Sequence, residues 1–315
     1  MGRRGGAVVR VGGGVMAMPA AMPFHDYAAI PAINFSTLKH MSVSPRMYRH
    51  RLTHPEPRKR AWVLGGAIHC NVLEPDAFDA RYLTPDPGVV KDLAPARNTK
   101  RGKLLIEEHP EWGTDAMTSD EYQAACVAAA FPGREILTAA QRAICIAAGD
   151  AVREHRAARD LLRGGLAEEV VTWTATDTGL ACKGRLDYLR PDLVIDLKST
   201  HDPSPERFAR DAVKYGYAAQ VAFYHDGAVR SKRRDGKRLP CIIAVRAGDD
   251  FDVAAFQIEP ETFDVGRSIY LSLLRKLAEC TAADYWPGVA PELWPLYLPP
   301  WAAGEIIDTD SSEDT

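Results

Sequence analysis

The sequence predicts an α+β fold of the α/β-like kind, with a mixed central β-sheet flanked by helices and a helical region before the sheet. Two observations predict it. Helical patterns dominate residues 26–165, whereas 166–303 opens with three successive strand-like segments. A helical pattern at 217–230 then separates these segments from two more strands, an order that favours a layered sheet over a helix bundle.

Length and composition predict one large domain. The chain has 315 residues, of which 46% are hydrophobic and 26% charged, so it has enough apolar material for a core. We expect this domain at 26–303, between a disordered leader at 1–25 and a disordered acidic tail at 304–315. The formal net charge is −3, and the tail holds five acidic residues and no basic one. Any nucleic-acid surface must therefore be a local patch.

The cysteines exclude a common class of metal site. All six are widely spaced and no C-x-x-C pair occurs, which argues against a zinc knuckle or an iron–sulfur cluster. Reduced, mostly buried thiols are expected, as in a cytoplasmic protein. No apolar run has the length needed to span a bilayer, so no membrane association is expected.

The first helices are expected at 37–41, at 45–52 and at 61–73. Gly65 and Gly66 lie inside the third of these, where glycine costs about 1 kcal/mol relative to alanine unless the backbone packs closely against a neighbour. His69 lies one turn beyond Gly65 on the same face. A lone histidine on an apolar helix is more often a core residue than a ligand, and these residues by themselves leave both readings open.

Residues 84–115 read as irregular because they contain four prolines. Within them, the basic cluster 97–103 contains Lys100 and Arg101, which fit a loop that follows phosphates as well as they fit a solvated surface loop. Two alanine-rich helices are expected next, at 119–130 and at 138–162.

The opening strand of the sheet is expected at 166–176. It carries Glu168 and Glu169, and strand alternation places neighbouring side chains on opposite faces, so only one of the two can point into a site. The second strand, at 180–189, carries Arg185 and Asp187.

A hairpin at 184–200 carries the most informative charges. Pro191-Asp192 makes its turn, and the apolar run that follows ends in Asp196-Leu197-Lys198. Asp196 and Lys198 are two apart and share a face, and twist brings Asp187 beside them. Two carboxylates in one small volume repel unless a hard cation such as Mg²⁺ lies between them. A surface salt bridge explains most D-x-K sequences, but the placement of Asp187 favours a metal-dependent phosphodiester site.

The remaining segments complete the sheet and cover it. In the helix expected at 217–230, Gln220 and Tyr224 are four apart and share a face. The loop 231–238 contains five basic residues, although such runs are usually solvated. Strands are expected at 240–246 and 253–258, and a helix at 261–279.

The hairpin resembles the D…(D/E)-x-K signature of the PD-(D/E)XK nuclease superfamily, through Asp187, Asp196 and Lys198. Its surroundings resemble the exonuclease VIII (RecE-type) branch from phages and prophages. The similar blocks are INFSTLKHMSVSPRMYRHRL, VLGGAIHCNVLEPDAFDARYL and the Q-x-x-x-Y of Gln220 and Tyr224, and the resemblance runs from about residue 27 to 301.

The resemblance implies a restriction-endonuclease-like core and a Mg²⁺-dependent exonuclease, with Mn²⁺ able to substitute. The implied enzyme degrades double-stranded DNA in the 5′–3′ direction and leaves 3′ overhangs for recombination. Double-stranded DNA ends, a single-strand annealing protein and further copies in a ring-shaped homo-oligomer are the implied partners, in the cytoplasm of a bacterial or phage-infected cell. The alternatives are a single-strand or structure-specific endonuclease and a degenerate DNA-binding protein.

The resemblance also implies roles for individual residues. Asp187, Asp196 and Lys198 are the implied catalytic residues, assisted by a glutamate, Glu168 or Glu169. The implied metal ligands are His69, Asp187, Asp196 and the Leu197 carbonyl. The residues expected to contact DNA are Gln220, Tyr224, Arg185, Lys100 and Arg101.

Overall fold

The structure is a computed structural model that describes residues 8–11, 14–17, 22–56, 60–114, 117–233, 235–248 and 250–298. The predicted acidic tail at 304–315 lies outside the described residues, as does much of the predicted leader. Within the leader, β1 (Val8–Val11) and β2 (Gly14–Ala17) pair as antiparallel strands, where disorder was predicted. Valine is favoured in strands because its branched side chain suits extended backbone.

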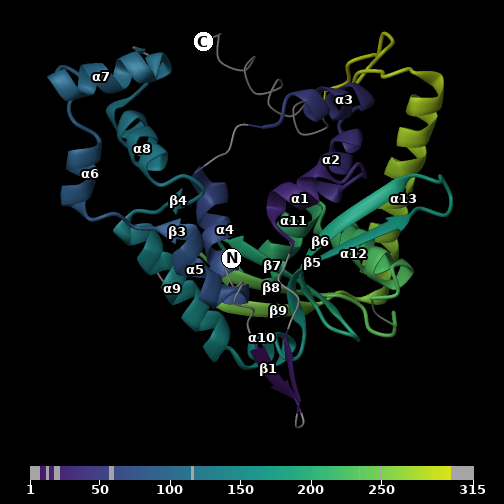
Figure 1. Cartoon of the computed structure of the whole chain (residues 1–315). Coiled ribbons are helices and arrows are strands. Elements are labelled where there is room, and N and C mark those ends of the chain that lie inside the picture. Colours follow the sequence, from purple (N-terminus) through teal and green to yellow (C-terminus); the bar gives the residue numbers. More distant parts are fainter. Residues whose placement is uncertain are drawn as a thin grey trace, which may run out of the picture.

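A five-stranded mixed sheet forms the centre of the molecule (Figure 1). Its strands are β5 (Leu166–Thr174), β6 (Ala181–Leu189), β7 (Val194–Thr200), β8 (Cys241–Arg246) and β9 (Val253–Gln257). They are hydrogen-bonded in sequence order, and only β7 and β8 run parallel to each other. The parallel pair requires a crossover, and the chain makes it through two helices. The predicted mixed α+β fold is confirmed.

Helices surround this sheet. Before it come α1 (Phe24–Ala29), α2 (Phe35–Leu38), α3 (Pro45–Thr53), α4 (Arg60–Leu73), α5 (Pro75–Arg81), α6 (Pro87–Leu93), α7 (Lys100–Glu108), α8 (Ser119–Ala130), α9 (Ala139–Glu154) and α10 (Arg156–Leu161). The crossover contains α11 (Pro205–Tyr215) and α12 (Tyr217–Arg230), and α13 (Pro260–Ala283) follows β9. None of the described helices has both the length and the apolar character that crossing a membrane requires.

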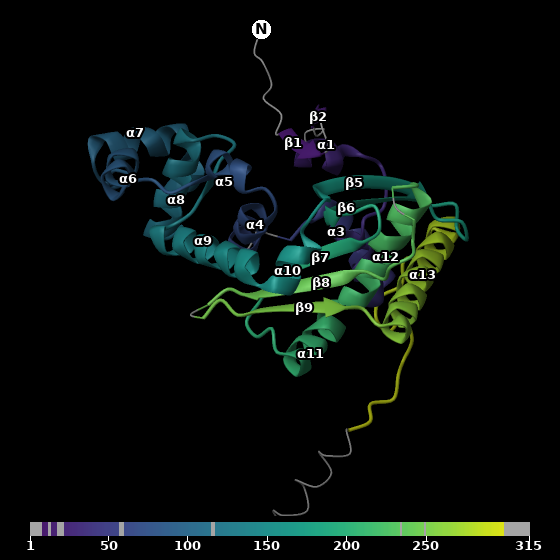
Figure 2. The ribbon, with the colours of Figure 1, turned by 90° about the horizontal axis from the view of Figure 1, so that it is seen from below.

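Two hydrophobic cores lie on opposite faces of the sheet. On one face, Phe223 of α12 and Leu274 of α13 pack with Ile242 of β8. On the other face, α4 and α9 pack against Ile195 and the alternate residues of β7 and β8. Figures 1 and 2 show the sheet between these two helical layers. Because β7 and β8 are covered on both sides, charged residues on them are removed from bulk water.

The predicted irregular segment at 84–115 is wrong in part, because it contains α6 and α7. Pro87 occupies the first turn of α6, where its missing N–H costs nothing, and the Asp86 side chain accepts from Gly88 N–H to cap the helix. Thr99 caps α7 through the Gly102 N–H. Pro87 therefore starts a helix instead of breaking one.

The predicted helix at 138–162 is two helices. His155 has an extended backbone (φ −66°, ψ 114°), which ends α9, and its Nδ1 accepts from Ala158 N–H at the start of α10. The apolar residues keep their helical spacing across this point, but the His155 side chain caps a new helix and so divides the segment in two.

The helices α6 to α8 form an insertion between two short parallel strands, β3 (Tyr82–Leu83) and β4 (Glu135–Ile136). It has its own small core around Trp112 and Tyr122. In both Figure 1 and Figure 2 the insertion stands to one side of the sheet.

Candidate active site

The two central strands of the sheet separate at the point where the charged residues lie. β6 and β7 pair only at Tyr188–Ile195 and Leu189–Val194, next to the turn. Beyond these pairs, the Asp187 carboxylate replaces a ladder bond, because its Oδ2 accepts from the Leu197 N–H at 2.8 Å. This side-chain-to-backbone bond fixes one carboxylate in the fork between β6 and β7.

Asp196 and Lys198 lie on β7 beside this fork and share a face, as strand alternation predicts. Lys198 Nζ lies 2.5 Å from Asp196 Oδ2. Asp196 is only 1% exposed, and neither of its carboxylate oxygens has a hydrogen-bond partner of acceptable geometry in the described part of the chain. A buried carboxylate with one ion pair and no hydrogen bond is costly, as is common at sites that bind a ligand.

His69 reaches the same fork from α4. Its Nδ1 lies 3.6 Å from Asp187 Oδ2. The glycine before it allows this approach, because a Cβ on Gly65 would come within 3.3 Å of Ser199 Oγ on β7. At Gly65, the absence of a side chain lets the helix backbone lie close to β7.

Of the two neighbouring glutamates on β5, only one lies beside the charged cluster. The β5–β6 register places Glu168 opposite Asp187, at the one interior position of this ladder where the residues do not pair. Glu168 has a φ of +55°, a left-handed conformation that non-glycine residues rarely adopt, and its Oε2 lies 2.6 Å from Arg185 Nε. Glu169 instead forms an ion pair with Arg233. Glu168 is therefore the glutamate nearer to the fork.

Burial changes the protonation of the whole group. It raises the pKa of Asp196 to about 6, with Lys198 opposing the shift. Burial and the neighbouring Asp187 raise the pKa of Glu168 to about 7, and burial also raises the pKa of Asp187. Burial lowers the pKa of His69 to about 4, so its imidazole is neutral at pH 7. Burial alone would lower the pKa of Lys198, but the two aspartates outweigh it and raise that pKa.

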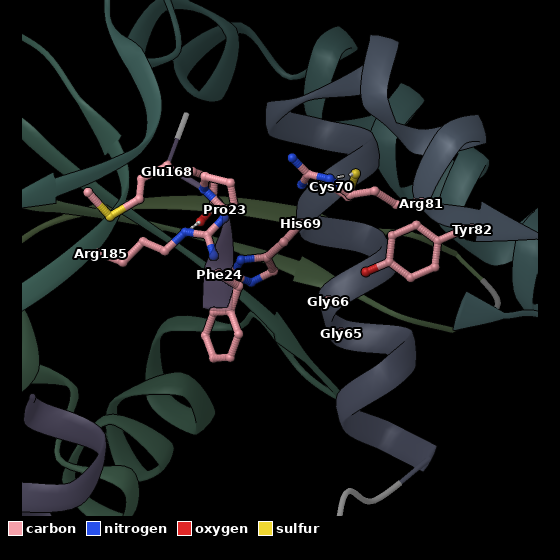
Figure 3. Close-up of a pocket in the computed structure, with 11 residues that line it drawn as sticks. Pro23, Phe24, Gly65, Gly66, His69, Cys70, Arg81, Tyr82, Glu168 and Arg185 are labelled. Carbon is pink, nitrogen blue, oxygen red and sulfur yellow. Dashed lines mark hydrogen bonds and ion pairs between the residues drawn. The ribbon is translucent and has the colours of Figure 1, made fainter. Parts of the chain in front are cut away.

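A pocket of about 610 Å³ opens beside this cluster (Figure 3). Phe24 of α1 and both members of the Glu168–Arg185 pair lie on one side of it, and His69 of α4 lies on the other. Asp187, Asp196 and Lys198 are not among the lining residues, but Asp187 adjoins His69 of the wall and lies opposite Glu168 in the sheet. The pocket thus leads to the cluster by way of residues that contact it.

The residues predicted to contact DNA separate into three groups. Arg185 lines the pocket. Gln220 and Tyr224 lie on α12, on the other face of the sheet, where Gln220 Nε2 donates to the Tyr224 hydroxyl and buried Tyr224 packs against Gly184. Lys100 and Arg101 are exposed in the first turn of α7, on the insertion, and do not line the pocket.

Tyr217, which no sequence motif pointed to, contacts the lysine of the cluster. Lys198 Nζ lies 5.0 Å from the centre of the Tyr217 ring, a cation–π distance. Phe208 and Tyr215 support this ring, each at a centroid distance of 5.7 Å. Gly216, with φ +71°, joins α11 to α12 and places Tyr217 at the start of α12. In the sequence, the only feature that could have pointed to Tyr217 is its place directly after Gly216, at the start of a helix.

The oxygen atoms of this cluster suit Mg²⁺, although they come from few side chains. No group of three His, Cys, Asp or Glu side chains that could hold a metal occurs among the described residues. Mg²⁺ does not need one, since it usually keeps several waters and binds through one or two carboxylates. The buried oxygens of Asp196 without hydrogen bonds, the Asp187 carboxylate and the Leu197 carbonyl are hard oxygen ligands of this kind.

The sequence also matches a known protein family. The model of a family described as "PDDEXK-like domain of unknown function (DUF3799)" matches residues 34–292. The chain belongs to this PDDEXK-like family. The match covers the sheet and both helical layers and begins after α1. Among curated proteins, no sequence matches this one significantly.

Solved structures support the fold assignment. A crystal structure from Eubacterium rectale, described as a "putative exonuclease", matches with a TM-score of 0.52 and 11% identity, over 93% of this chain and 99% of that one. At this identity the likeness shows a shared fold. The crystal structure of SSO0001 matches with 15% identity over 72% of this chain and 86% of that one, but its TM-score of 0.27 is too low to support the fold.

Proposed function

We propose that this PDDEXK-like protein is a Mg²⁺-dependent DNA exonuclease that hydrolyses phosphodiester bonds from duplex ends. The observation that carries the proposal is the buried Asp196, whose oxygens lack hydrogen bonds while Lys198 and Asp187 adjoin them. Strongly shifted pKa values in a cluster of this kind are typical of functional sites. The family assignment and the name given to the Eubacterium rectale protein point to the same chemistry.

In this proposal Asp187, Asp196 and the Leu197 carbonyl bind the metal ion, and His69 supports the site as a neutral ligand. Bound there, Mg²⁺ would supply a positive charge that stabilises the transition state and the leaving oxygen. Lys198, held as an ammonium by the two aspartates, orients the attacking water. Its ion pair with Asp196 holds the ammonium in the cluster. Glu168 lies across from Asp187 and assists as a second acid–base group.

The positive groups outside the cluster hold the DNA. Arg185 lies in the pocket beside Glu168, where a phosphate next to the scissile one would pass. Lys100 and Arg101 project from the first turn of α7 and would contact phosphates farther along the duplex. Gln220 and Tyr224 support the Lys198 side of the sheet from α12, since Tyr224 is buried.

The direction and the products follow the RecE-type resemblance. We propose degradation in the 5′–3′ direction on double-stranded DNA, which leaves a 3′ overhang for an annealing protein. The active form proposed is a ring-shaped homo-oligomer. The exposed apolar residues near the end of the described chain, among them Leu293, Trp294 and Leu296, are candidates for contacts between copies.

The test compares DNA with and without ends. Purified protein with Mg²⁺ is given linear duplex labelled at either the 5′ or the 3′ end, and in parallel covalently closed circular duplex. We expect loss of the linear duplex, early release of the 5′ label and an intact circle. Equal cutting of the circle would identify an endonuclease, and binding without any cutting would identify a degenerate DNA-binding protein. Light scattering that finds only monomers of a processive enzyme would exclude the ring.

A further inference from the structure

The segment 22–30 forms one wall of the pocket, although it precedes the family match at 34–292. Met22, Pro23 and Phe24 line the pocket, and Phe24 begins α1. This segment packs against β6, the strand that carries Asp187 and Arg185. One side of the pocket is therefore built by residues that the domain itself does not contribute.

Lys183 of β6 anchors this segment. It is only 4% exposed, and its Nζ donates to three carbonyls at the end of α1: Tyr27 at 2.9 Å, Ala28 at 3.0 Å and Ile30 at 2.8 Å. Two of these carbonyls also accept from backbone N–H groups, Tyr27 from Ile30 and Ile30 from Ala32. The same ammonium lies 4.8 Å from the centre of the buried Tyr27 ring. A charge buried with three hydrogen bonds fixes the segment on the sheet.

Phe24 is the exposed end of this anchored segment. Its side chain is 66% exposed, yet it stands at the edge of a pocket with the Arg185 guanidinium 5.7 Å from its ring centre. Tyr27 lies at a centroid distance of 6.1 Å. Apart from these two neighbours, much of the Phe24 ring is open, so a flat group could stack on one of its faces (Figure 3).

The opposite wall of the pocket is α4, with the side chains of Arg81 and Tyr82 beside it (Figure 3). Gly65 and Gly66 expose helix backbone there, and a Cβ on Gly66 would come within 3.2 Å of the Tyr82 hydroxyl oxygen. The volume of about 610 Å³ lies in the range of small-molecule sites. The pocket thus combines an open aromatic ring and polar groups that suit a flat, polar ligand.

We propose that this pocket is a nucleobase subsite, in which Phe24 stacks on the base of the nucleotide adjoining the scissile phosphate. The proposal rests on the proposed nuclease function, because His69 and Glu168 connect the pocket to the Asp187 cluster. Stacking on an aromatic ring tolerates any base, since every base has a π-face. The subsite would therefore hold a terminal nucleotide in place without reading its sequence.

Fluorescence of 2-aminopurine tests this subsite. Two linear duplexes carry the probe, one at the 5′-terminal and one at the 3′-terminal nucleotide, and Ca²⁺ replaces Mg²⁺ to prevent cutting. We expect the wild type to change the fluorescence of the 5′ probe at saturation. Phe24→Ala and Phe24→Leu should lose most of this change and weaken end binding roughly tenfold, the effect of one base–aromatic stack. Phe24→Tyr should retain both.

Ile269→Ala is the matched control, because Ile269 is an exposed apolar residue on α13, outside the pocket. Thermal melting of each variant confirms the fold, and anisotropy confirms saturation. An unchanged 5′ signal in Phe24→Ala and Phe24→Leu would overturn the base subsite even if the wild type cuts DNA in Mg²⁺. A Phe24-dependent signal at the 3′ probe would uphold the subsite and overturn the proposed polarity. Absence of cutting by the wild type would refute the nuclease function separately.

Discussion

Asp187 on β6 accepts a hydrogen bond from the Leu197 N–H on β7 at 2.8 Å, just beyond the last paired residues of the two strands. The carboxylate thereby takes the place of a backbone carbonyl in the ladder. The same Oδ2 lies 3.6 Å from His69 Nδ1. One side chain therefore joins two strands and a helix, and any substitution of Asp187 affects both the site and the fold.

Asparagine and alanine at position 187 should separate these two effects. Asp187→Asn keeps an oxygen that can accept from Leu197, so its stability should stay near that of the wild type while Mn²⁺ affinity falls. Asp187→Ala leaves the Leu197 N–H without a partner and should also lose about 1–3 kcal/mol in the free energy of unfolding. Calorimetric titration with Mn²⁺ and urea unfolding measure the two quantities. Wild-type Mn²⁺ affinity in Asp187→Asn would contradict the ligand role.

His69→Ala should weaken Mn²⁺ binding, because a neutral imidazole beside Asp187 is removed. The low pKa of His69, about 4, keeps the ring nitrogen free of an extra proton at neutral pH, as a ligand requires. The same calorimetric titration gives the affinity, and partial rescue of cleavage by raised metal concentration is expected. If this variant binds Mn²⁺ and cuts DNA normally and only melts earlier, His69 is a core residue.

Lys198→Ala should bind Mn²⁺ and DNA but cut slowly. The carboxylates stay, whereas the group that positions or activates water is lost, so the cleavage rate should fall on the order of 10²–10⁴-fold. Single-turnover cleavage at saturating metal, with binding followed by anisotropy in Ca²⁺, separates the two steps. Loss of Mn²⁺ binding in this variant would show that Lys198 organises the ligands instead.

The stability of the metal-free protein should fall as the pH rises through 6 to 7. Burial raises the pKa of Asp196 to about 6 and that of Glu168 to about 7, above their ordinary values. A group whose pKa is raised by folding stabilises the fold below its unfolded pKa, and this contribution is lost as pH passes the folded pKa. The loss should be about 3 kcal/mol for each carboxyl, because each pKa lies more than two units above its ordinary value.

Urea unfolding between pH 5 and 8 in EDTA measures this fall. Glu168→Gln and Asp196→Asn should each flatten the curve, because an amide does not titrate. Mn²⁺ affinity should rise over the same interval, since the metal displaces the protons. Stability that instead increases between pH 6 and 8 would show that these carboxylates have low pKa values in the folded protein.

Tyr217 should act as a positioning residue for Lys198. Tyr217→Phe keeps the ring and should cut DNA almost as fast as the wild type. Tyr217→Leu removes a cation–π contact worth about 0.5–2 kcal/mol, so kcat should fall a few-fold to about thirtyfold with KM for DNA unchanged. Its alkaline limb in the pH–rate profile should move to lower pH, because the ammonium form of Lys198 is less stabilised. A merely structural role would lower thermal stability and leave this profile unchanged.

Local periodicity predicted which of the charged residues share a face. Asp196 and Lys198 share a face because strand side chains alternate, and His69 lies one turn from Gly65 because helices repeat every 3.6 residues. The ion pair of Asp196 with Lys198 and the contact of His69 with Asp187 agree with those predictions. The turn at Pro191-Asp192 was equally local, and Arg190 and Leu193 close it with backbone hydrogen bonds.

The sequence by itself thus determined the mixed α+β class and the charged hairpin, because these depend on residues a few positions apart. Only the tertiary structure decided that Glu168 and not Glu169 adjoins Asp187, and that Tyr217 holds Lys198. It also decided that Phe24 borders the pocket. Such contacts join elements far apart in the chain, and they form only when the packing of the whole domain fixes which faces meet.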